Sequence, residues 1–461
     1  MILRNQRKKA SKTRRGSLLG SKFKPKFEML EDRRVLAAFT PGDVVVYRVG
    51  SITSPTDLVN TGAEVWLDEY SPSGTLVQSI ALPASGTDKL IASGTATSEG
   101  LLSRSVDGQY LVLTGYNATM PTSNLVSTSG ATANRVIGRV DGSGTVDVTT
   151  KFPDFASGNN PRSAASTDGI DLWMGGGTGG VRYGQFESPT QDPDNASNQL
   201  TTTPVNIRQV AIFNGQLYMS SASGANIGVN TVGSGVPTSG TQTATLLNGL
   251  SGVTTSPYAF HFADLDAGVA GDDTLYIADD AAGLMKFSLV AGTWTASGVV
   301  GVNADDYRGV TATVSAGTVT LFATRKGGSN AAGGGELVRI VDTTGYNGNV
   351  SSLVPTLLAT ASTKTAFRGV ALVPAVASAP PVVTTTGSAL SYNEDAGSVA
   401  VDPGLTVTDD GANLFGATVS ITSNYVSGED VLSYTNQNGI SGSWNAATGI
   451  MTLSGTASPL T

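Results

Sequence analysis

The sequence has no cysteine, one histidine and few charged residues. Of its 461 residues, 14% are Asp, Glu, Lys or Arg, and His261 is the single histidine. The absence of cysteine excludes disulfides, thiolate nucleophiles and Cys-ligated zinc. One histidine excludes metal sites built from several imidazoles, and no G-x-S-x-G motif offers a serine for it to activate. The classes of enzyme that depend on these groups are therefore not expected.

Long apolar runs are also missing, whereas residues that favour turns are abundant. No run approaches the roughly 18–20 apolar residues of a transmembrane helix, so no membrane-spanning helix is expected. Glycine occurs 57 times, and Ser and Thr are frequent. This composition favours many short strands joined by turns. We therefore predict an all-β protein.

The net charge of −8 is unevenly distributed along the chain. Residues 1–34 contain twelve of the 28 Lys/Arg and three of the 36 Asp/Glu, which leaves 16 basic and 33 acidic residues in the remainder. A body with a net charge of −17 lacks the basic surface that neutralises phosphates. Nucleic acid is therefore not expected as a partner.

The basic N-terminus, residues 1–38, lacks the apolar run of a conventional signal peptide. Its end, "FEMLEDRRVLAAF", resembles the LEPR-XLL-type sorting segment of large bacterial surface and secreted proteins. The residues that match are Leu30, Glu31, Arg33, Arg34 and Leu36. Asp32 and Val35 depart from the pattern. The resemblance implies a disordered sorting segment and export to the cell surface or the extracellular space.

A phrase of the type R-G-V, followed by a turn and a second apolar strand, recurs six times at intervals of 46 to 60 residues. The repeats begin at Arg104, Arg162, Arg208, His261, Arg308 and Arg368. Asp-Gly, Asn-Gly and Ala-Gly pairs separate the first two strands of most repeats, as tight hairpins require. Four strands in about 50 residues is the size of a propeller blade.

The sixth repeat, "TAFRGVALVP", stops after one strand. The N-terminal "PGDVVVYRVG" and the two strands after it supply what is missing, so we predict that both ends of the chain build one blade. This closure would leave no exposed edge. The fold predicted for residues 39–375 is a six-bladed β-propeller with N/C strand closure.

A second domain is expected after a Pro/Ala linker at residues 376–383. Residues 384–461 resemble the cadherin-like repeats of bacterial adhesins, from "LSYNEDAGSVAV" to "GIMTLSGTAS". About 100 residues make a complete sandwich of this type. The resemblance therefore implies an incomplete cadherin-like, Ig-like β-sandwich with an unpaired edge.

The six residues that begin the repeats are the candidate anion-binding site. Equivalent positions on the inner strands of a propeller form a ring at one mouth of the channel. Five guanidinium groups there would bind a carboxylate or phosphate. Alternatively, each arginine bonds to the neighbouring blade and has a structural role, which repetition favours. His261 is interpreted as a substitution at the arginine position.

Calcium is the one candidate cofactor, since it requires several converging oxygens. The resemblance to cadherin-like repeats implies Glu394, Asp395, Asp409 and Asp410 as ligands, although no D-x-D-x-D run is present. The hairpin "DLDAGVAGDD" offers a second set, Asp264, Asp266 and Asp272. Both sets have the alternative interpretation of acids that favour turns.

We therefore expect an exported surface or matrix protein that acts in binding or adhesion, without catalysis. Its expected partners are a surface polysaccharide or other surface proteins. The alternatives are a carbohydrate-binding module without adhesion, and a polysaccharide-acting enzyme with its site at the channel mouth. Paired carboxylates near the arginines would favour the enzyme, and the sequence shows none.

Overall fold

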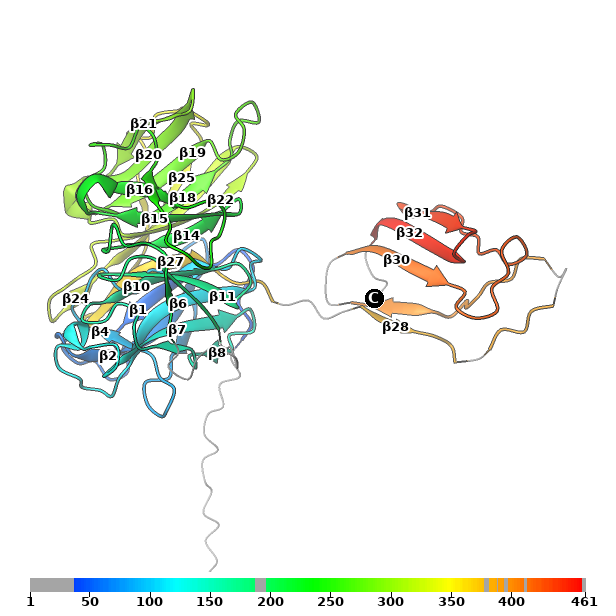
Figure 1. Cartoon of the computed structure of the whole chain (residues 1–461), viewed down its shortest axis with the longest axis horizontal. Helices are drawn as coiled ribbons and strands as arrows, with labels where there is room; N and C mark the ends of the chain where they lie inside the picture. Colours follow the sequence, from blue (N-terminus) through cyan, green and yellow to red (C-terminus); the bar gives the residue numbers. More distant parts are fainter. Residues whose placement is uncertain are drawn as a thin grey trace, which may run out of the picture. The chain divides into compact units, whose positions relative to one another are not determined.

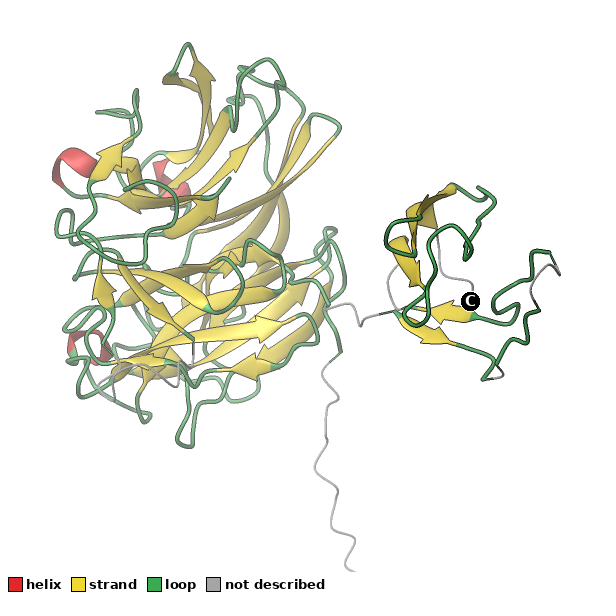
Figure 2. Cartoon of the chain, turned by 45° about the vertical axis from the view of Figure 1, so that its right-hand side comes forward, coloured by secondary structure: helices red, strands yellow, loops and turns green. Residues whose placement is uncertain are grey.

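The computed structural model describes residues 37–186, 196–376, 381–387, 389–393, 397–409 and 413–457. Within these ranges the chain is all-β, as predicted, with three short 3₁₀ helices (Figure 2). The helices are η1 (Leu125–Ser127), η2 (Gly224–Asn226) and η3 (Asn303–Asp305). No helix in the described part of the chain has the length and apolar character needed to cross a membrane. The predicted sorting residues, which are Leu30, Glu31, Arg33, Arg34 and Leu36, lie outside the described residues.

Four separate four-stranded antiparallel sheets follow one another along the chain, each with its strands in sequence order. The first has β10 (Pro161–Ser166), β11 (Asp171–Gly176), β12 (Arg182–Gln185) and β13 (Asn198–Gln199). The second has β14 (Val210–Phe213), β15 (Gln216–Ser221), β16 (Gly228–Val232) and β17 (Ala244–Leu246). The third has β18 (Pro257–Ala263), β19 (Thr274–Asp279), β20 (Gly283–Val290) and β21 (Thr293–Val300). The fourth has β22 (Gly309–Ser315), β23 (Thr318–Arg325), β25 (Glu336–Asp342) and β26 (Thr356–Thr360).

Two further meanders belong to one 11-stranded sheet and are joined through β4 (Ile91–Ser93). One consists of β27 (Thr365–Leu372), β1 (Val44–Val49), β2 (Gly62–Tyr70) and β3 (Leu76–Ala81). The other consists of β5 (Ser103–Arg104), β6 (Tyr110–Asn117), β7 (Asn134–Asp141), β8 (Val146–Asp147) and β9 (Lys151–Phe152). The short β24 (Gly333–Gly334) pairs in parallel with β27.

The pairing of β27 with β1 joins the two ends of this part of the chain (Figure 1). The strands are antiparallel, with Val44 opposite Leu372 and Val49 opposite Ala366. Val44 and Val46 pack with Phe367 and Val370 in one buried apolar cluster. The predicted pairing of the late strand with the first strand is present.

The tight turns between first and second strands take the conformations that their sequences favour. Asn214 and Gly215 have φ of 45° and 72°, and Ala316 and Gly317 have φ of 49° and 76°. Two successive positive φ angles characterise the two-residue turn that matches the twist of a hairpin. These turns fix the register of β14 with β15 and of β22 with β23.

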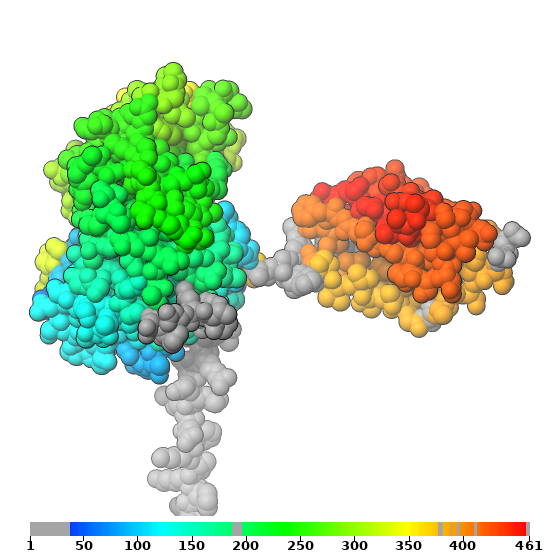
Figure 3. Space-filling view, viewed as in Figure 1, coloured from blue at the N-terminus to red at the C-terminus, as the bar shows by residue number. Residues whose placement is uncertain are grey.

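The first strands of the six meanders contact one another. Contacts join β5 with β10, β10 with β14, β18 with β22, β22 with β27, and β27 with β5. The strand β18 contacts the second of the four separate sheets through β15. Large apolar side chains fill the spaces between neighbouring sheets, and Figure 3 shows the continuous surface that results on one face. The fold of residues 37–376 is therefore propeller-like, with the first strands innermost.

The described residues after 380 form two small sheets. In one, β28 (Val382–Thr384) pairs with β29 (Thr406–Thr408). In the other, β32 (Ile450–Ala457) lies between β30 (Leu414–Ser420) and β31 (Ile440–Asn445). Met451 is the one large hydrophobic residue buried in this described part.

Candidate ligand-binding cavity

Hydrogen bonds between neighbouring meanders show which residues share a level along the first strands. The backbone N–H groups of Leu101, Ala259 and Gly369 donate to the carbonyls of Arg162, Arg308 and Gly100, respectively. In the same way, Ser220 Oγ and Thr324 Oγ1 donate to the carbonyls of Tyr258 and Arg368. Arg162, Arg208, Arg308 and Arg368 therefore share one level with Tyr258 and Gly100.

Arg104 and His261 lie at another level, so the prediction of six equivalent positions was wrong for these two. Arg104 follows Gly100 by four residues, and His261 follows Tyr258 by three. At about 3.3 Å per residue of extended chain, Arg104 lies roughly 13 Å and His261 roughly 10 Å further along. The spacing of the repeats in the sequence does not show this difference in position, because it is the hydrogen bonds between neighbouring meanders that align the strands.

Arg162 and Arg208 contact the meander that follows theirs. Arg162 Nη1 donates to Ile207 O at 3.0 Å and to the side chain of Asn206. Arg208 donates to the hydroxyl of Tyr258 and lies over its ring at 4.2 Å. Burial, with the nearby charge of Arg208, lowers the pKa of Arg162 to about 10, so it remains charged at neutral pH.

Arg308 and Arg368 make equivalent connections. Arg308 forms an ion pair of 3.1 Å with Asp280 of the preceding meander. Arg368 donates to Gly328 O at 3.2 Å and to Gly94 O at 3.3 Å, and so connects the segments on both sides. Each of these four arginines bonds to a neighbouring meander, which is the contact expected if the arginines have a structural role.

A central cavity of about 280 Å³ lies at the level of Arg104 and His261. Every one of the six first strands contributes to its lining, for example through Ser166, Thr311 and Leu372. Arg104 is exposed, and its guanidinium makes one hydrogen bond within the described part of the chain, to Val373 O at 3.3 Å. None of the described residues that line the cavity is Asp or Glu.

Several other polar groups of this cavity are available to a ligand. Gln209 is 4% exposed, and its Oε1 accepts a hydrogen bond from Phe260 N at 3.0 Å. Its Nε2 has no hydrogen-bond partner among the described residues. His261 packs edge-on against Phe213 at 5.4 Å between ring centroids. Burial and the charge of Arg104 lower the pKa of His261 to about 4, so its imidazole is neutral at neutral pH.

A neighbouring cavity of about 420 Å³ shares Arg104 and Leu372 with the central one and is also lined by Asp43. Asp43 is 3% exposed, and its Oδ2 has no hydrogen-bond partner among the described residues. Burial and the adjacent Glu69 raise the pKa of Asp43 to about 6. Glu69 is fixed by Thr40 N and Gln78 Nε2, both at 2.7 Å. This carboxyl pair was not predicted from the sequence, because only the pairing of β1 with β2 brings the two residues together.

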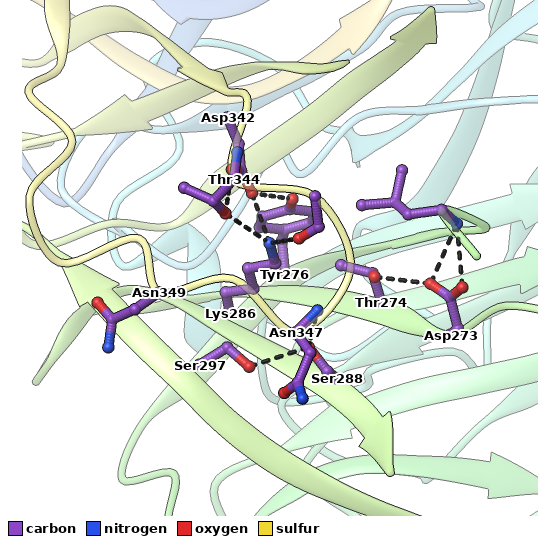
Figure 4. Close-up of polar contacts among 12 residues, drawn as sticks. Asp273, Thr274, Tyr276, Lys286, Ser288, Ser297, Asp342, Thr344, Asn347 and Asn349 are labelled. Carbon is purple, nitrogen blue, oxygen red and sulfur yellow. Dashed lines mark hydrogen bonds and ion pairs between the residues drawn. The ribbon is translucent and has the colours of Figure 1, made fainter. Parts of the chain in front are cut away.

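A second polar cluster, also missed, is buried between the third and fourth of the separate sheets (Figure 4). Lys286 Nζ lies 2.8 Å from Asp342 Oδ2 and donates to Gly345 O at 2.6 Å. Tyr276 donates to the same carboxylate at 2.5 Å. Burial raises the pKa of Asp342, but the hydrogen bonds from Lys286, Thr344 and Tyr276 outweigh it and hold the pKa below its ordinary value. The sequence signal was a lysine within an apolar strand, "GLMKFSL".

The candidate calcium ligands are not gathered into a site. No group of three or more His, Cys, Asp or Glu residues within the described ranges is placed to hold a metal ion. Asp266 Oδ1 accepts from Gly268 N at 2.9 Å, which is the contact of a turn acid, and Asp264 and Asp272 lie in the same hairpin. Asp409 follows β29, whereas Glu394, Asp395 and Asp410 lie outside the described residues. The predicted convergence of Asp264, Asp266 and Asp272 is therefore corrected to a set of turn positions.

Comparisons with known proteins give a fold resemblance alone. No protein-family model and no curated sequence matches the chain. A nidogen/laminin complex matches with a TM-score of 0.43 and 12% identity over 73% of this chain and 100% of that one. A putative 6-phosphogluconolactonase from Bacteroides uniformis has a TM-score of 0.37 and 14% identity over 69% and 83%. A periplasmic gluconolactonase from Pseudomonas aeruginosa has a TM-score of 0.34 and 12% identity over the same shares. Likenesses this distant carry no argument about activity.

Proposed function

We propose that this chain is an exported surface or matrix protein whose residues 39–375 form a six-bladed propeller that binds a ligand in its central cavity. The observation that carries the proposal is the convergence of all six first strands on one cavity with an arginine whose only hydrogen bond to the described residues is to a carbonyl. Small-molecule sites are concave and contain a few polar groups in a largely apolar lining. The mouth of a propeller channel is such a place.

The export and adhesion parts of the proposal rest on the two resemblances in the sequence. The sorting segment supports export, and the cadherin-like segment supports a role in a surface array. The partners that fit are a surface polysaccharide or another surface protein. The acidic charge of the chain after residue 34 remains an argument against nucleic acid.

The test is binding of the full-length protein to a glycan array, compared with a variant in which the cavity is filled. Thr311 lines the cavity and is half-buried, so Thr311→Trp fills it without removing an apolar core residue. We expect binding to be lost in this variant while the melting temperature stays within a few degrees. Unchanged binding by Thr311→Trp would place the ligand site elsewhere and contradict the proposal.

A second candidate function, a polysaccharide-acting enzyme, is favoured by the carboxyl pair of Asp43 and Glu69. A carboxyl group with a pKa near 6 is suited to proton transfer at neutral pH. Asp43 borders the cavity that Arg104 also lines. Release of new chain ends from an acidic polysaccharide, and its loss in Asp43→Asn, would support the enzyme over the binding module.

A further inference from the structure

We propose that the central cavity binds a sugar acid, with the carboxylate of the ligand on Arg104 and its hydroxyl groups on Gln209, Thr311 and His261. This inference rests on the proposed function, because it names the ligand class of the same cavity. The ligand is either a free hexuronate or the terminal residue of a uronate-containing polysaccharide.

The charge of the cavity differs from that of the protein around it. The chain after residue 34 has a net charge of −17, yet the described lining of the cavity contains an arginine and no carboxylate. His261 is neutral, so Arg104 provides the only formal charge among the described lining residues. A cavity with one positive charge and no counter-ion favours a ligand with one negative charge.

Arg104 is the arginine that lines the cavity, and its bonds leave it more available to a ligand than those of Arg162, Arg308 and Arg368. Arg308 already has Asp280, and Arg162 and Arg368 bond to carbonyls and are at most 8% exposed. Arg104 is exposed to the cavity, with one long bond to a carbonyl. Its guanidinium therefore has donors left for a bidentate contact with a carboxylate.

The remaining groups of the cavity fit a polyol better than a bare anion such as phosphate. Gln209 is a buried residue whose Nε2 has no hydrogen-bond partner in the described part of the chain, so this donor is available to a hydroxyl group of the ligand. Phe213 and Phe260 contribute aromatic surface to the lining. Aromatic rings pack against the apolar faces of sugars, while hydroxyls satisfy the polar groups.

The size of the cavity limits the ligand to about one sugar ring. Its volume of about 280 Å³ is at the lower end of the range for small-molecule sites. A longer chain could continue into the adjoining cavity of about 420 Å³, which shares Arg104 and Leu372. A terminal residue of a polysaccharide therefore fits as well as a free sugar acid.

The experiment is calorimetric titration of the full-length protein with D-galacturonate and D-glucuronate, and with galactose and glucose as neutral counterparts. We expect one uronate to bind at least tenfold more tightly than its neutral counterpart. Arg104→Gln should reduce uronate binding at least tenfold and leave the weak binding of the neutral sugar unchanged. Titration with inorganic phosphate should give weaker binding than the uronate.

The matched control is Arg339→Gln. Arg339 is half-buried and, like Arg104, is held by one carbonyl, Pro72 O at 3.0 Å, but it does not line the cavity. This variant should bind uronate as the wild type does. Equal uronate binding by Arg104→Gln and wild type, or tighter binding of phosphate than of uronate, would overturn the inference.

A further comparison separates the two sources of the ligand. Oligogalacturonate that binds at least as tightly as the monosaccharide indicates a chain end, and binding of the monosaccharide alone indicates a free sugar acid; both support the inference. If no uronate or oligogalacturonate binds but Thr311→Trp still abolishes glycan-array binding, the inference fails and the proposed function stands. If the array signal also survives Thr311→Trp, both fail.

Discussion

The propeller-like body and the region after residue 380 both consist of short strands joined by turns, but they bury very different amounts of apolar surface. In the body, β18–β19–β20 are almost entirely buried, because neighbouring sheets cover both of their faces. In the later region, β30 is mostly exposed, β31 alternates between half-buried and exposed residues, and Phe415 is 75% exposed. Alternating strand residues form sheets in both regions, but only the body surrounds its sheets with other sheets.

The difference shows where the stability of the chain resides. Burial of apolar surface is the dominant favourable contribution to folding. Within the described residues after 380, Trp444 is half-buried against Tyr425 at 6.0 Å, and Met451 is the large buried hydrophobic. The expectation of an incomplete sandwich with an unpaired edge agrees with this thin core and stays a prediction.

The largest expected difference in the free energy of unfolding is between the replacement of one tryptophan in the body and of one in the later region. Trp173 is 1% exposed, and its Nε1 donates to Pro237 O at 2.6 Å. Trp173→Ala should lower the free energy of unfolding of the body by about 3–5 kcal/mol, because it leaves a cavity and an unpaired carbonyl. Trp444→Ala should leave the main transition unchanged. Urea unfolding of the two full-length variants measures both, and equal effects would refute the comparison.

Lys286→Met should destabilise the body by about 3–5 kcal/mol, because it leaves the carboxylate of Asp342 buried without its partner. Both residues are at most 1% exposed. The double variant Lys286→Met/Asp342→Leu should recover most of the loss, since no unpaired charge remains. Thermal unfolding measures both proteins. If Lys286→Met alone is as stable as the wild type, the ion pair contributes nothing to the stability of the body.

Glu99 should make the body less stable as the pH rises. Burial raises the pKa of Glu99 from 4.5 to about 7, although hydrogen bonds from Tyr116 and Ser93 partly oppose this. The folded protein therefore keeps a proton that the unfolded chain loses, so stability is highest below about pH 4.5 and falls up to about pH 7. The loss from this group is about 3 kcal/mol at most.

The control for this pH dependence is Glu99→Gln, which cannot ionise. Its free energy of unfolding should vary less between pH 4.5 and 7 than that of the wild type, even if its absolute stability is lower. Parallel pH profiles of the two proteins would count against the titration of Glu99.

The smallest expected effect concerns an ion pair between sheets that has no counterpart among the described residues after 380. Arg308→Ala removes the ion pair with Asp280 and should cost about 1–2 kcal/mol. Arg104→Gln should cost less than about 0.5 kcal/mol, because an exposed residue with one long bond contributes little. Melting temperatures of the two variants test this difference, and the reverse order would contradict the assigned roles.

The sequence predicted features that depend on local signals, and missed those that depend on contacts between distant strands. Asn214-Gly215 predicted its hairpin because two residues determine the turn. The single strand at Arg368 predicted the pairing with β1 because a blade needs four strands. By contrast, Arg104 was assigned to the wrong position along its strand, since the backbone hydrogen bonds of Leu101 and Gly369 determine how that strand is aligned with its neighbours. The neighbouring positions of Asp43 and Glu69 depend on the pairing of two strands, and the contact of Lys286 with Asp342 depends on the packing of two sheets, so neither could be predicted from the sequence.

A crystal structure of the full-length protein with digalacturonate would test the central claim most directly. We predict the six first strands around one channel and the sugar carboxylate on Arg104, at the end that contains His261. Density for the ligand at the other end, among Arg162, Arg208, Arg308 and Arg368, would contradict the assignment of those four arginines to structure and of Arg104 to binding.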